Sequence, residues 1–289
     1  MSAYPPDWSR PWWRDWRAWV EPVWSEWHHQ LAQQAPDTIC LPDVLNRVDP
    51  SSPVRFVPQA ALPPGQSYEH FIFTQRQVPT RDNLHDLFNA CCWRRFPRTK
   101  SRLNALQADV IGREGVGAKR GPLRDALTLF DENALLLQAP PGLWAVLRAH
   151  DWHTLLVTHS PDWWAAGLAR TSAASGNRAV PVAGGASGEA VPCLLRPVVF
   201  GHALLEKLCQ PYKSITAHAF WIDPKLPATD IAWDAWLAER LDASFMASKP
   251  FQPLPVMGIP GWCEDNADPA FYADVEVFRP VSVRAHHPR

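Results

Sequence analysis

The chain has 289 residues, 46% of them hydrophobic, which is enough to bury a sizeable core. Its 28 Lys and Arg residues balance 29 Asp and Glu residues, so no net field attracts it to nucleic acid, and no run of about 18 apolar residues could span a membrane. The N-terminus lacks the charged-then-apolar order of a signal peptide, so we expect a cytoplasmic protein without a nucleic-acid partner.

The organisation predicted along the chain is a single domain over residues 1–289. Residues 1–66 form a Trp-rich arm followed by a Pro-rich connector, and residues 67–280 form the core. Residues 171–190 are rich in Gly, Ala and Ser, which is typical of a flexible insertion.

Seven tryptophans fall within the first 31 residues. Trp12, Trp16 and Trp19 recur at helical spacing after Pro11, and Pro22 is expected to start a second helix. The indoles either pack on this chain, each N–H needing an acceptor, or contact a protein partner or a second copy. Three Arg and four acidic residues share the stretch, so it lacks the basic face of a membrane-surface helix, and packing on this chain is favoured.

The remaining elements follow from hydrophobic periodicity and from turn residues. In chain order we expect a strand over 68–74, a helix over 80–96, a helix from Pro97 to 111, a β-hairpin over 125–138 with its tip at 131–133, a helix starting near Pro141, a strand over 194–200, a short helix over 201–209, a strand over 214–222, a helix over 229–247 and a loop-rich tail. Strands and crossover helices do not alternate regularly, so a doubly wound sheet is disfavoured. The fold class is therefore α+β, with a small, mostly antiparallel sheet packed against several helices and with many Pro-rich loops.

The helix predicted over 80–96 carries two stripes, with Thr80 as its expected N-cap. Its apolar stripe includes Cys91 and Cys92. The chain has no C-x-x-C pair and free Cys is among the most buried residue types, so we expect both to be buried and reduced. A polar stripe lies on another face and consists of Asp82, His85, Asp86 and Asn89. Such a stripe either orients an imidazole with a carboxylate or is a solvated face.

The turn between this helix and the next carries Arg98, Lys100 and Asn104. Guanidinium and ammonium groups at such a turn could hold an anion, and we count these residues, with Asp82 and Asn89, as candidate binding residues. Ordinary solvated charge is the alternative.

Several long motifs occur in a fixed order along the chain. They are VPTRDNLHDLFNACCWRRFPRTKSRLNALQ, RGPLRDALTLFDENALLL, FGHALLEKL with PYKSITAHA, and PLPVMGIPGW with NADPAFYADVEVFRP. Over most of residues 68–280 the chain resembles the uncharacterised bacterial domain-of-unknown-function family 3025. The resemblance implies a bacterial origin but supplies no activity, cofactor or catalytic residue.

Three histidines lie inside these motifs, at His85, His202 and His218. His202 and Glu206 are four residues apart on the predicted short helix and therefore share a face. If the three histidines meet, they could bind a divalent metal ion together with Asp86 or Glu206 and activate water. Otherwise His202 caps its helix or bonds a carbonyl, and His218 is a core histidine.

Two functions remain open from the sequence. The first is a hydrolase-like enzyme with His85, Asp86 and His202 as catalytic residues and with His85, His202, Glu206 and His218 as candidate metal ligands. The second is a non-catalytic binding or scaffold protein that uses the Trp-rich arm or the Arg-rich helical hairpin around Arg94 and Arg95.

Overall fold

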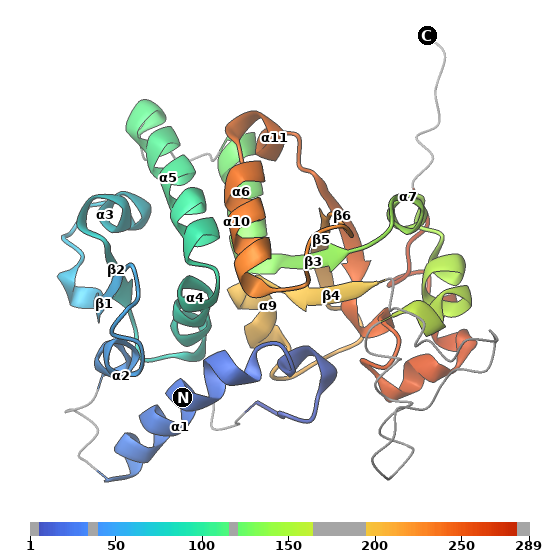
Figure 1. Cartoon of the computed structure of the whole chain (residues 1–289), viewed down its shortest axis with the longest axis horizontal. Coiled ribbons are helices and arrows are strands. Elements are labelled where there is room, and N and C mark those ends of the chain that lie inside the picture. Colours follow the sequence, from blue (N-terminus) through green and yellow to red (C-terminus); the bar gives the residue numbers. More distant parts are fainter. Residues whose placement is uncertain (1–5, 34–39, 116–120, 164–194, 282–289) are drawn as a thin grey trace. The chain divides into compact units, whose positions relative to one another are not determined.

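The structure, a computed structural model, describes residues 6–33, 40–115, 121–163 and 195–281 (Figure 1). The insertion predicted at 171–190 lies outside the described residues. The chain forms two compact units. Unit 1 comprises residues 1–135, 199–210 and 226–250, and unit 2 comprises residues 136–198, 211–225 and 251–289.

Unit 1 is mostly helical and contains one small parallel pair of strands (Figure 1). Its elements are η1 (Pro11–Trp13), α1 (Arg17–Gln33), α2 (Leu41–Val48), β1 (Arg55–Pro58), η3 (Gln59–Ala61), α3 (Tyr68–Gln75), β2 (Gln77–Thr80), α4 (Leu84–Arg95), α5 (Pro97–Glu114), α6 (Pro122–Asn133), α9 (His202–Lys207), α10 (Asp230–Arg240) and α11 (Ala243–Ala247). The Pro-rich connector predicted at the end of residues 1–66 was wrong in part, because α2 and β1 form within it.

The Trp-rich segment packs on its own unit, as the favoured alternative predicted. Trp12, Trp13 and Trp16 are buried, and the indole N–H of Trp16 donates to the backbone carbonyl of Val199 at 2.8 Å. The indole N–H of Trp13 meets no acceptor among the described residues. The expectation that each buried indole N–H has an acceptor therefore does not hold for Trp13. Pro22 lies inside α1, so the predicted start of a second helix was wrong.

The start of α4 differs from the predicted one. Asn83, rather than Thr80, is the N-cap, and its side chain accepts a hydrogen bond from the backbone N–H of Asp86 at 2.8 Å. Thr80 is the last residue of β2 and bonds the carbonyl of Val78. The predicted break at Pro97 is confirmed, because proline suits the first turn of α5.

Two predicted strands of unit 1 are helical. Residues 68–74 belong to α3, where the hydroxyl of Ser67 caps the N-terminus and Arg76 ends the helix at φ 55°. Residues 125–133 belong to α6, which begins at Pro122, so the predicted hairpin tip is the last turn of a helix. Short apolar runs fit a strand and a buried helix equally well, and tertiary burial decided between them here. The single helix predicted over 229–247 is divided into α10 and α11.

Unit 2 contains most of a four-stranded sheet, ordered β4-β3-β5-β6. Its elements are β3 (Ala134–Gln138), α7 (Pro141–Arg148), a π-helix (His153–Thr158), η5 (Ser160–Asp162), β4 (Arg196–Val199), β5 (Thr216–Ile222), β6 (Phe251–Pro255), η6 (Val256–Gly258), η7 (Glu264–Ala267) and η8 (Pro269–Ala273). β5 and β6 pair antiparallel, with Thr216 opposite Pro255. The predicted α+β class is confirmed.

No helix in the described ranges is both long enough and apolar enough to cross a bilayer.

Candidate functional site

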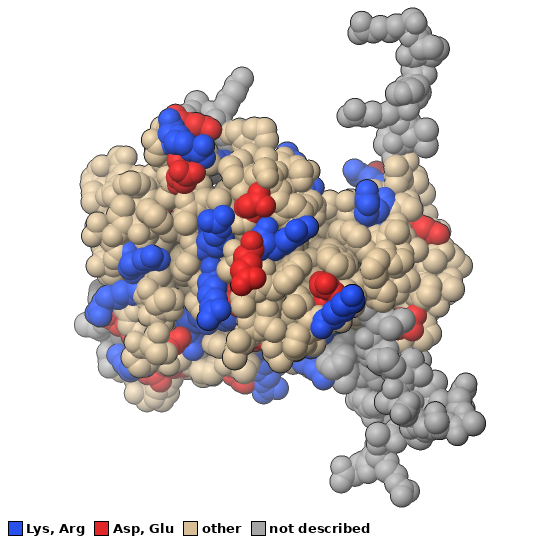
Figure 2. Space-filling view, turned by 45° about the horizontal axis from the view of Figure 1, so that its top comes forward, with Lys and Arg blue, Asp and Glu red and all other residues tan. Residues whose placement is uncertain are grey.

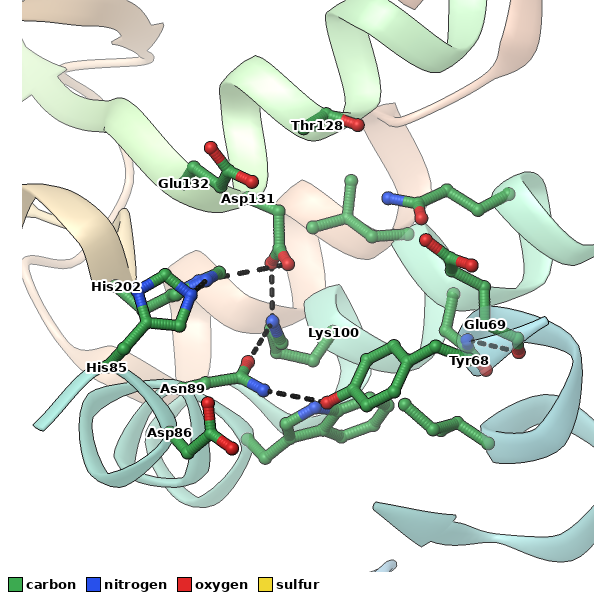
Figure 3. Close-up of a pocket in the computed structure, with 15 residues that line it drawn as sticks. Tyr68, Glu69, His85, Asp86, Asn89, Lys100, Thr128, Asp131, Glu132 and His202 are labelled. Carbon is green, nitrogen blue, oxygen red and sulfur yellow. Dashed lines mark hydrogen bonds and ion pairs between the residues drawn. The ribbon is translucent and has the colours of Figure 1, made fainter. Parts of the chain in front are cut away.

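A cavity of about 180 Å³ lies within unit 1. Side chains from α3, α4, α5, α6 and α9 surround it (Figure 3). The lining residues are Tyr68, Glu69, Ile72, His85, Asp86, Asn89, Trp93, Lys100, Leu103, Asn104, Gln107, Thr128, Asp131, Glu132 and His202. Most of them are polar or ionisable, so the cavity is built for a polar ligand rather than for an apolar one.

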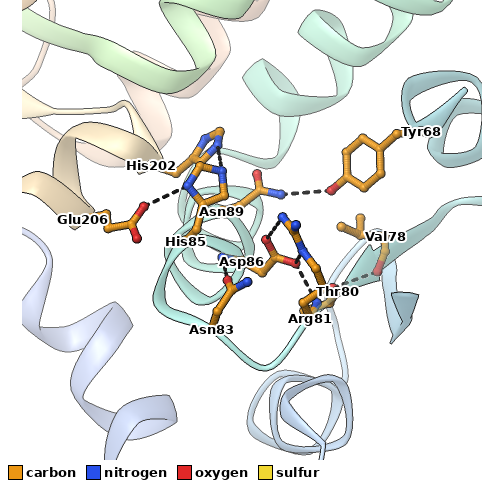
Figure 4. Close-up of polar contacts among 10 residues, drawn as sticks. All are labelled: Tyr68, Val78, Thr80, Arg81, Asn83, His85, Asp86, Asn89, His202 and Glu206. Carbon is orange, nitrogen blue, oxygen red and sulfur yellow. Dashed lines mark hydrogen bonds and ion pairs between the residues drawn. The ribbon is translucent and has the colours of Figure 1, made fainter. Parts of the chain in front are cut away.

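Helix α4 presents His85, Asp86 and Asn89 to the cavity, at the spacing that places them on one helical face. The carboxylate of Asp86 accepts hydrogen bonds from Arg81, with 2.6 Å to the backbone N–H and 3.0 Å to Nη2 (Figure 4). These bonds and the Asn83 cap satisfy backbone and side-chain groups at the helix start. The first turn of α4 is therefore held in place by its own sequence neighbours.

Helix α9 brings His202 to the cavity through a close backbone approach at Gly201. A Cβ atom at Gly201 would lie 2.2 Å from the carbonyl oxygen of Glu132 and 2.4 Å from the nitrogen of Asn133. Only glycine lets the start of α9 pack this closely against the end of α6. His202, the next residue, is 6% exposed.

His85 and His202 meet edge to face, with ring centroids 4.6 Å apart and an interplanar angle of 80°. Their Nε2 atoms are 3.1 Å apart (Figure 4). On the other side of the His85 ring, Nδ1 lies 2.9 Å from Oε2 of Glu206. Three side chains from α4 and α9 thus form one continuous line of hydrogen bonds.

The carboxylate of Glu206 determines which ring nitrogens of His85 and His202 carry a hydrogen. A carboxylate only accepts, so Nδ1 of His85 carries the hydrogen, and in the neutral ring Nε2 of His85 is the acceptor. Nε2 of His202 must then donate to Nε2 of His85, which leaves a lone pair on Nδ1 of His202. That Nδ1 atom is buried and has no hydrogen-bond partner among the described residues.

Nδ1 of His202 faces the carboxylate of Asp131, 3.8 Å from Oδ2, which is too far for a hydrogen bond (Figure 3). Burial lowers the pKa of His202 to about 4, against the opposing effect of the nearby Asp131 charge. Burial alone would raise the pKa of Asp131, but the Lys100 ammonium, together with smaller effects of His202 and His85, leaves that pKa below its ordinary value. His202 is therefore neutral and Asp131 ionised near pH 7.

Lys100 connects Asp131 to the opposite wall of the cavity. Its ammonium pairs with Asp131 and donates to Oδ1 of Asn89 at 2.8 Å. The amide of Asn89 donates in turn to the hydroxyl of Tyr68 at 3.1 Å. Burial raises the pKa of Tyr68, so its hydroxyl keeps its proton and can donate it into the cavity.

Most of the predicted site residues meet at this cavity. His85, Asp86, Asn89, Lys100, Asn104 and His202 all line it, and Glu206 contacts His85. Asp82 does not, because it lies before α4 and accepts a hydrogen bond from the backbone N–H of Leu41 at 2.6 Å. Arg98 is exposed, and its backbone N–H donates to Asp234 at 3.1 Å.

His218 does not belong to the cavity of unit 1. It lies on β5 in unit 2, opposite Pro253, with its ring 6.0 Å from that of Phe251. Glu206, another predicted metal ligand, accepts a hydrogen bond from Nδ1 of His85 and so orients that ring. In the part of the chain that the structure describes, no group of three or more His, Cys, Asp or Glu is arranged to hold a metal ion. The predicted four-residue metal site is thus not assembled there.

Tyr68, Glu69, Asp131 and Glu132 are cavity residues that the sequence did not reveal. Each of them lies in a segment that was predicted as strand or turn. Pro122 at a helix start, followed by apolar residues at helical spacing, was the signal that could have placed Asp131 on α6.

The comparison with protein families gives one result. The model of a family described as "Protein of unknown function (DUF3025)" matches residues 54–172 and 187–282. The unmatched residues 173–186 fall inside the segment predicted as an insertion. No curated protein and no solved structure matches the chain. Since the match spans more than half of the sequence, the chain belongs to the DUF3025 family of proteins of unknown function.

Proposed function

We propose that the protein is an enzyme that performs acid–base chemistry on a small polar substrate, with Nδ1 of His202 as the general base. The observation that carries this proposal is the line Glu206–His85–His202, which ends in a buried ring nitrogen without a hydrogen-bond partner among the described residues. A base held by a second group, itself held by a carboxylate, is the arrangement expected of a catalytic histidine.

In the proposed reaction His202 takes up a proton, and the residues around it stabilise the charge. A water or hydroxyl group in the cavity, within hydrogen-bond reach of both His202 and Asp131, would give its proton to Nδ1 of His202. The imidazolium that forms would be stabilised by Asp131 and, through His85, by Glu206. His85 and Glu206 are positioning residues in this scheme, because they act through His202.

The opposite wall supports a hydrolase-like reaction. The hydroxyl of Tyr68 accepts a hydrogen bond from Asn89, which leaves its own hydrogen for a ligand oxygen. A donor aimed at an oxygen that gains negative charge stabilises the transition state of acyl transfer. Base and donor face one cavity, as attack by an activated water requires.

The alternative function, a scaffold that uses the Trp-rich arm or the Arg-rich hairpin, has less support. The buried indoles of the arm belong to the core of unit 1. Arg94 pairs with Asp49 at 3.2 Å, and Arg95 pairs with Asp230 at 2.7 Å, so both guanidinium groups already have internal partners.

An activity screen of the purified protein tests the proposal. A panel of small esters, amides and other hydrolysable compounds would be assayed with the wild type and with His202→Asn. Loss of the base is expected to lower kcat by roughly 100-fold to 10,000-fold. His70→Gln is the matched control, because His70 is exposed on α3. Turnover that is equal in the wild type and His202→Asn would refute the assignment.

A further inference from the structure

Carboxylate side chains outnumber ammonium and guanidinium groups in the lining of the cavity. Glu69, Asp86, Asp131 and Glu132 are acidic, and Lys100 is the cationic residue among them. Lys100 pairs with Asp131, and Arg81 pairs with Asp86. No cationic partner of Glu69 or Glu132 is found among the described residues. The cavity therefore carries uncompensated negative charge, which favours a cation over an anion.

The hydrogen-bonding groups near His85 and His202 also favour a ligand that donates hydrogens. Nδ1 of His202 and Oδ2 of Asp131 are both acceptors, and they face each other across 3.8 Å. His202 is 6% exposed, so bulk water does not compensate its lone pair. A ligand group that reaches this point must donate a hydrogen, which a carboxylate group cannot do.

The cavity also limits the size of the ligand. Its volume is about 180 Å³, well below the roughly 300–1,000 Å³ of sites for drug-sized molecules. Glu69 lies on the side of the cavity opposite His85 and His202 (Figure 3). The hydroxyl of Ser67 donates to Oε2 of Glu69 at 3.0 Å and helps to fix that carboxylate.

We propose that this cavity binds a small organic cation, an aliphatic amine with a hydrogen-bond donor at its other end, whose ammonium group is held by Glu69. The donor end then lies within hydrogen-bond reach of both Asp131 and His202. The ligand class rests on the charge, the acceptors and the size of the cavity. Only its description as a substrate rests on the proposed function.

Calorimetric titration with three matched probes tests this proposal. 3-Aminopropan-1-ol is the cation, 1,3-propanediol is the neutral analogue and 3-hydroxypropanoate is the anion. At pH 7 and low salt the wild type is expected to bind the cation at least tenfold more tightly than either analogue. Glu69→Gln is expected to remove most of that preference.

Glu239→Gln is the control, because Glu239 is an exposed carboxylate on α10 in the same unit and does not line the cavity. It should bind the cation as the wild type does. Equal binding of the three probes, tighter binding of the anion, no binding of the cation, or full cation binding by Glu69→Gln would each overturn the proposal.

Failure of the ligand class and failure of the proposed function give different results. If His202→Asn leaves turnover unchanged while Glu69→Gln weakens amine binding, the catalytic role is lost and the cation site remains. If His202→Asn abolishes turnover while the titrations show no preference for the cation, the catalytic role remains and the cation site is refuted.

Discussion

Nε2 of His202 lies 3.1 Å from Nε2 of His85, although the two residues are 117 positions apart in the chain. Two neutral imidazoles can approach in this way only if one Nε2 carries the hydrogen and the other does not. Glu206 decides which, because it accepts the Nδ1 hydrogen of His85. The charge behind His85 thus determines the tautomer of His202, where the proposed base is located.

Nitrogen-15 NMR of the histidine side chains should show this pair of tautomers directly. Near pH 7 we expect His85 to carry its hydrogen on Nδ1 and His202 to carry its hydrogen on Nε2. In Glu206→Gln the amide can donate as well as accept, so the preference of both rings should weaken. An unchanged pair of tautomers in Glu206→Gln would show that Glu206 does not direct them.

The buried, neutral state of His202 should make stability depend on pH. Its folded pKa of about 4 is below its unfolded value of about 6.5, so the unfolded chain binds more protons between these values. This contribution is fully present above about pH 6.5 and is lost as pH falls toward 4, by up to about 3 kcal/mol. The facing groups are the carboxylate and the backbone carbonyl of Asp131, which raise the pKa of His202, and Lys100 and His85, which lower it.

Urea unfolding followed from pH 4 to pH 7 measures this slope. His202→Asn should flatten the slope in that window, whatever its effect on absolute stability. His70→Gln should leave the slope as in the wild type, because His70 is exposed and lies outside the cavity. A slope that persists in His202→Asn would assign the effect to other groups.

Gly201→Ala should destabilise unit 1 and displace His202. The new methyl group would overlap the backbone of Glu132 and Asn133, and backbone cannot move aside as a flexible side chain can. We expect a loss of about 1–3 kcal/mol in the free energy of unfolding. The histidine tautomers should change as well, because α9 carries His202.

Gly112→Ala is the matched control for Gly201. Gly112 lies inside α5, and a Cβ atom there would meet nothing within 4 Å. Alanine should therefore stabilise the helix by about 0.5–1 kcal/mol. If both alanine variants are equally stable, the close approach at Gly201 does not constrain the fold.

Lys100→Met should leave Asp131 as a charge without its cation. Breaking a buried pair on one side costs roughly 3 kcal/mol, whereas removing both charges costs much less. The double variant Lys100→Met with Asp131→Asn should therefore recover much of the stability, and a double-mutant cycle of unfolding free energies measures the coupling. Arg113→Met, which breaks an exposed pair with Asp109, should cost less than about 1 kcal/mol. Additive effects at Lys100 and Asp131 would contradict the pairing.

The surface charge on the face drawn in Figure 2 does not indicate a binding site for a charged partner. Lys and Arg side chains lie beside Asp and Glu side chains there, without an extended patch of one sign. This pattern matches the near balance of 28 basic and 29 acidic residues in the sequence. The cavity, rather than this face, therefore supports the strongest functional proposal.

Three features could be predicted from the sequence alone: the α+β class, the helix broken at Pro97 and the polar stripe His85, Asp86 and Asn89. These features depend on local periodicity and on proline geometry, which act within a few residues. Segment types that depend on burial were missed, as at 68–74 and 125–133, because the apolar pattern of a short segment does not distinguish helix from strand.

Which polar residues meet depends on how distant helices pack. The close approach at Gly201 brings His202 to His85, and the packing of α6 brings Asp131 to Lys100. His218 follows His202 by only 16 residues in the sequence, yet it lies in unit 2, whereas His202 lies in unit 1. Contacts between distant segments follow from how whole helices pack, and no local pattern in the sequence records that packing.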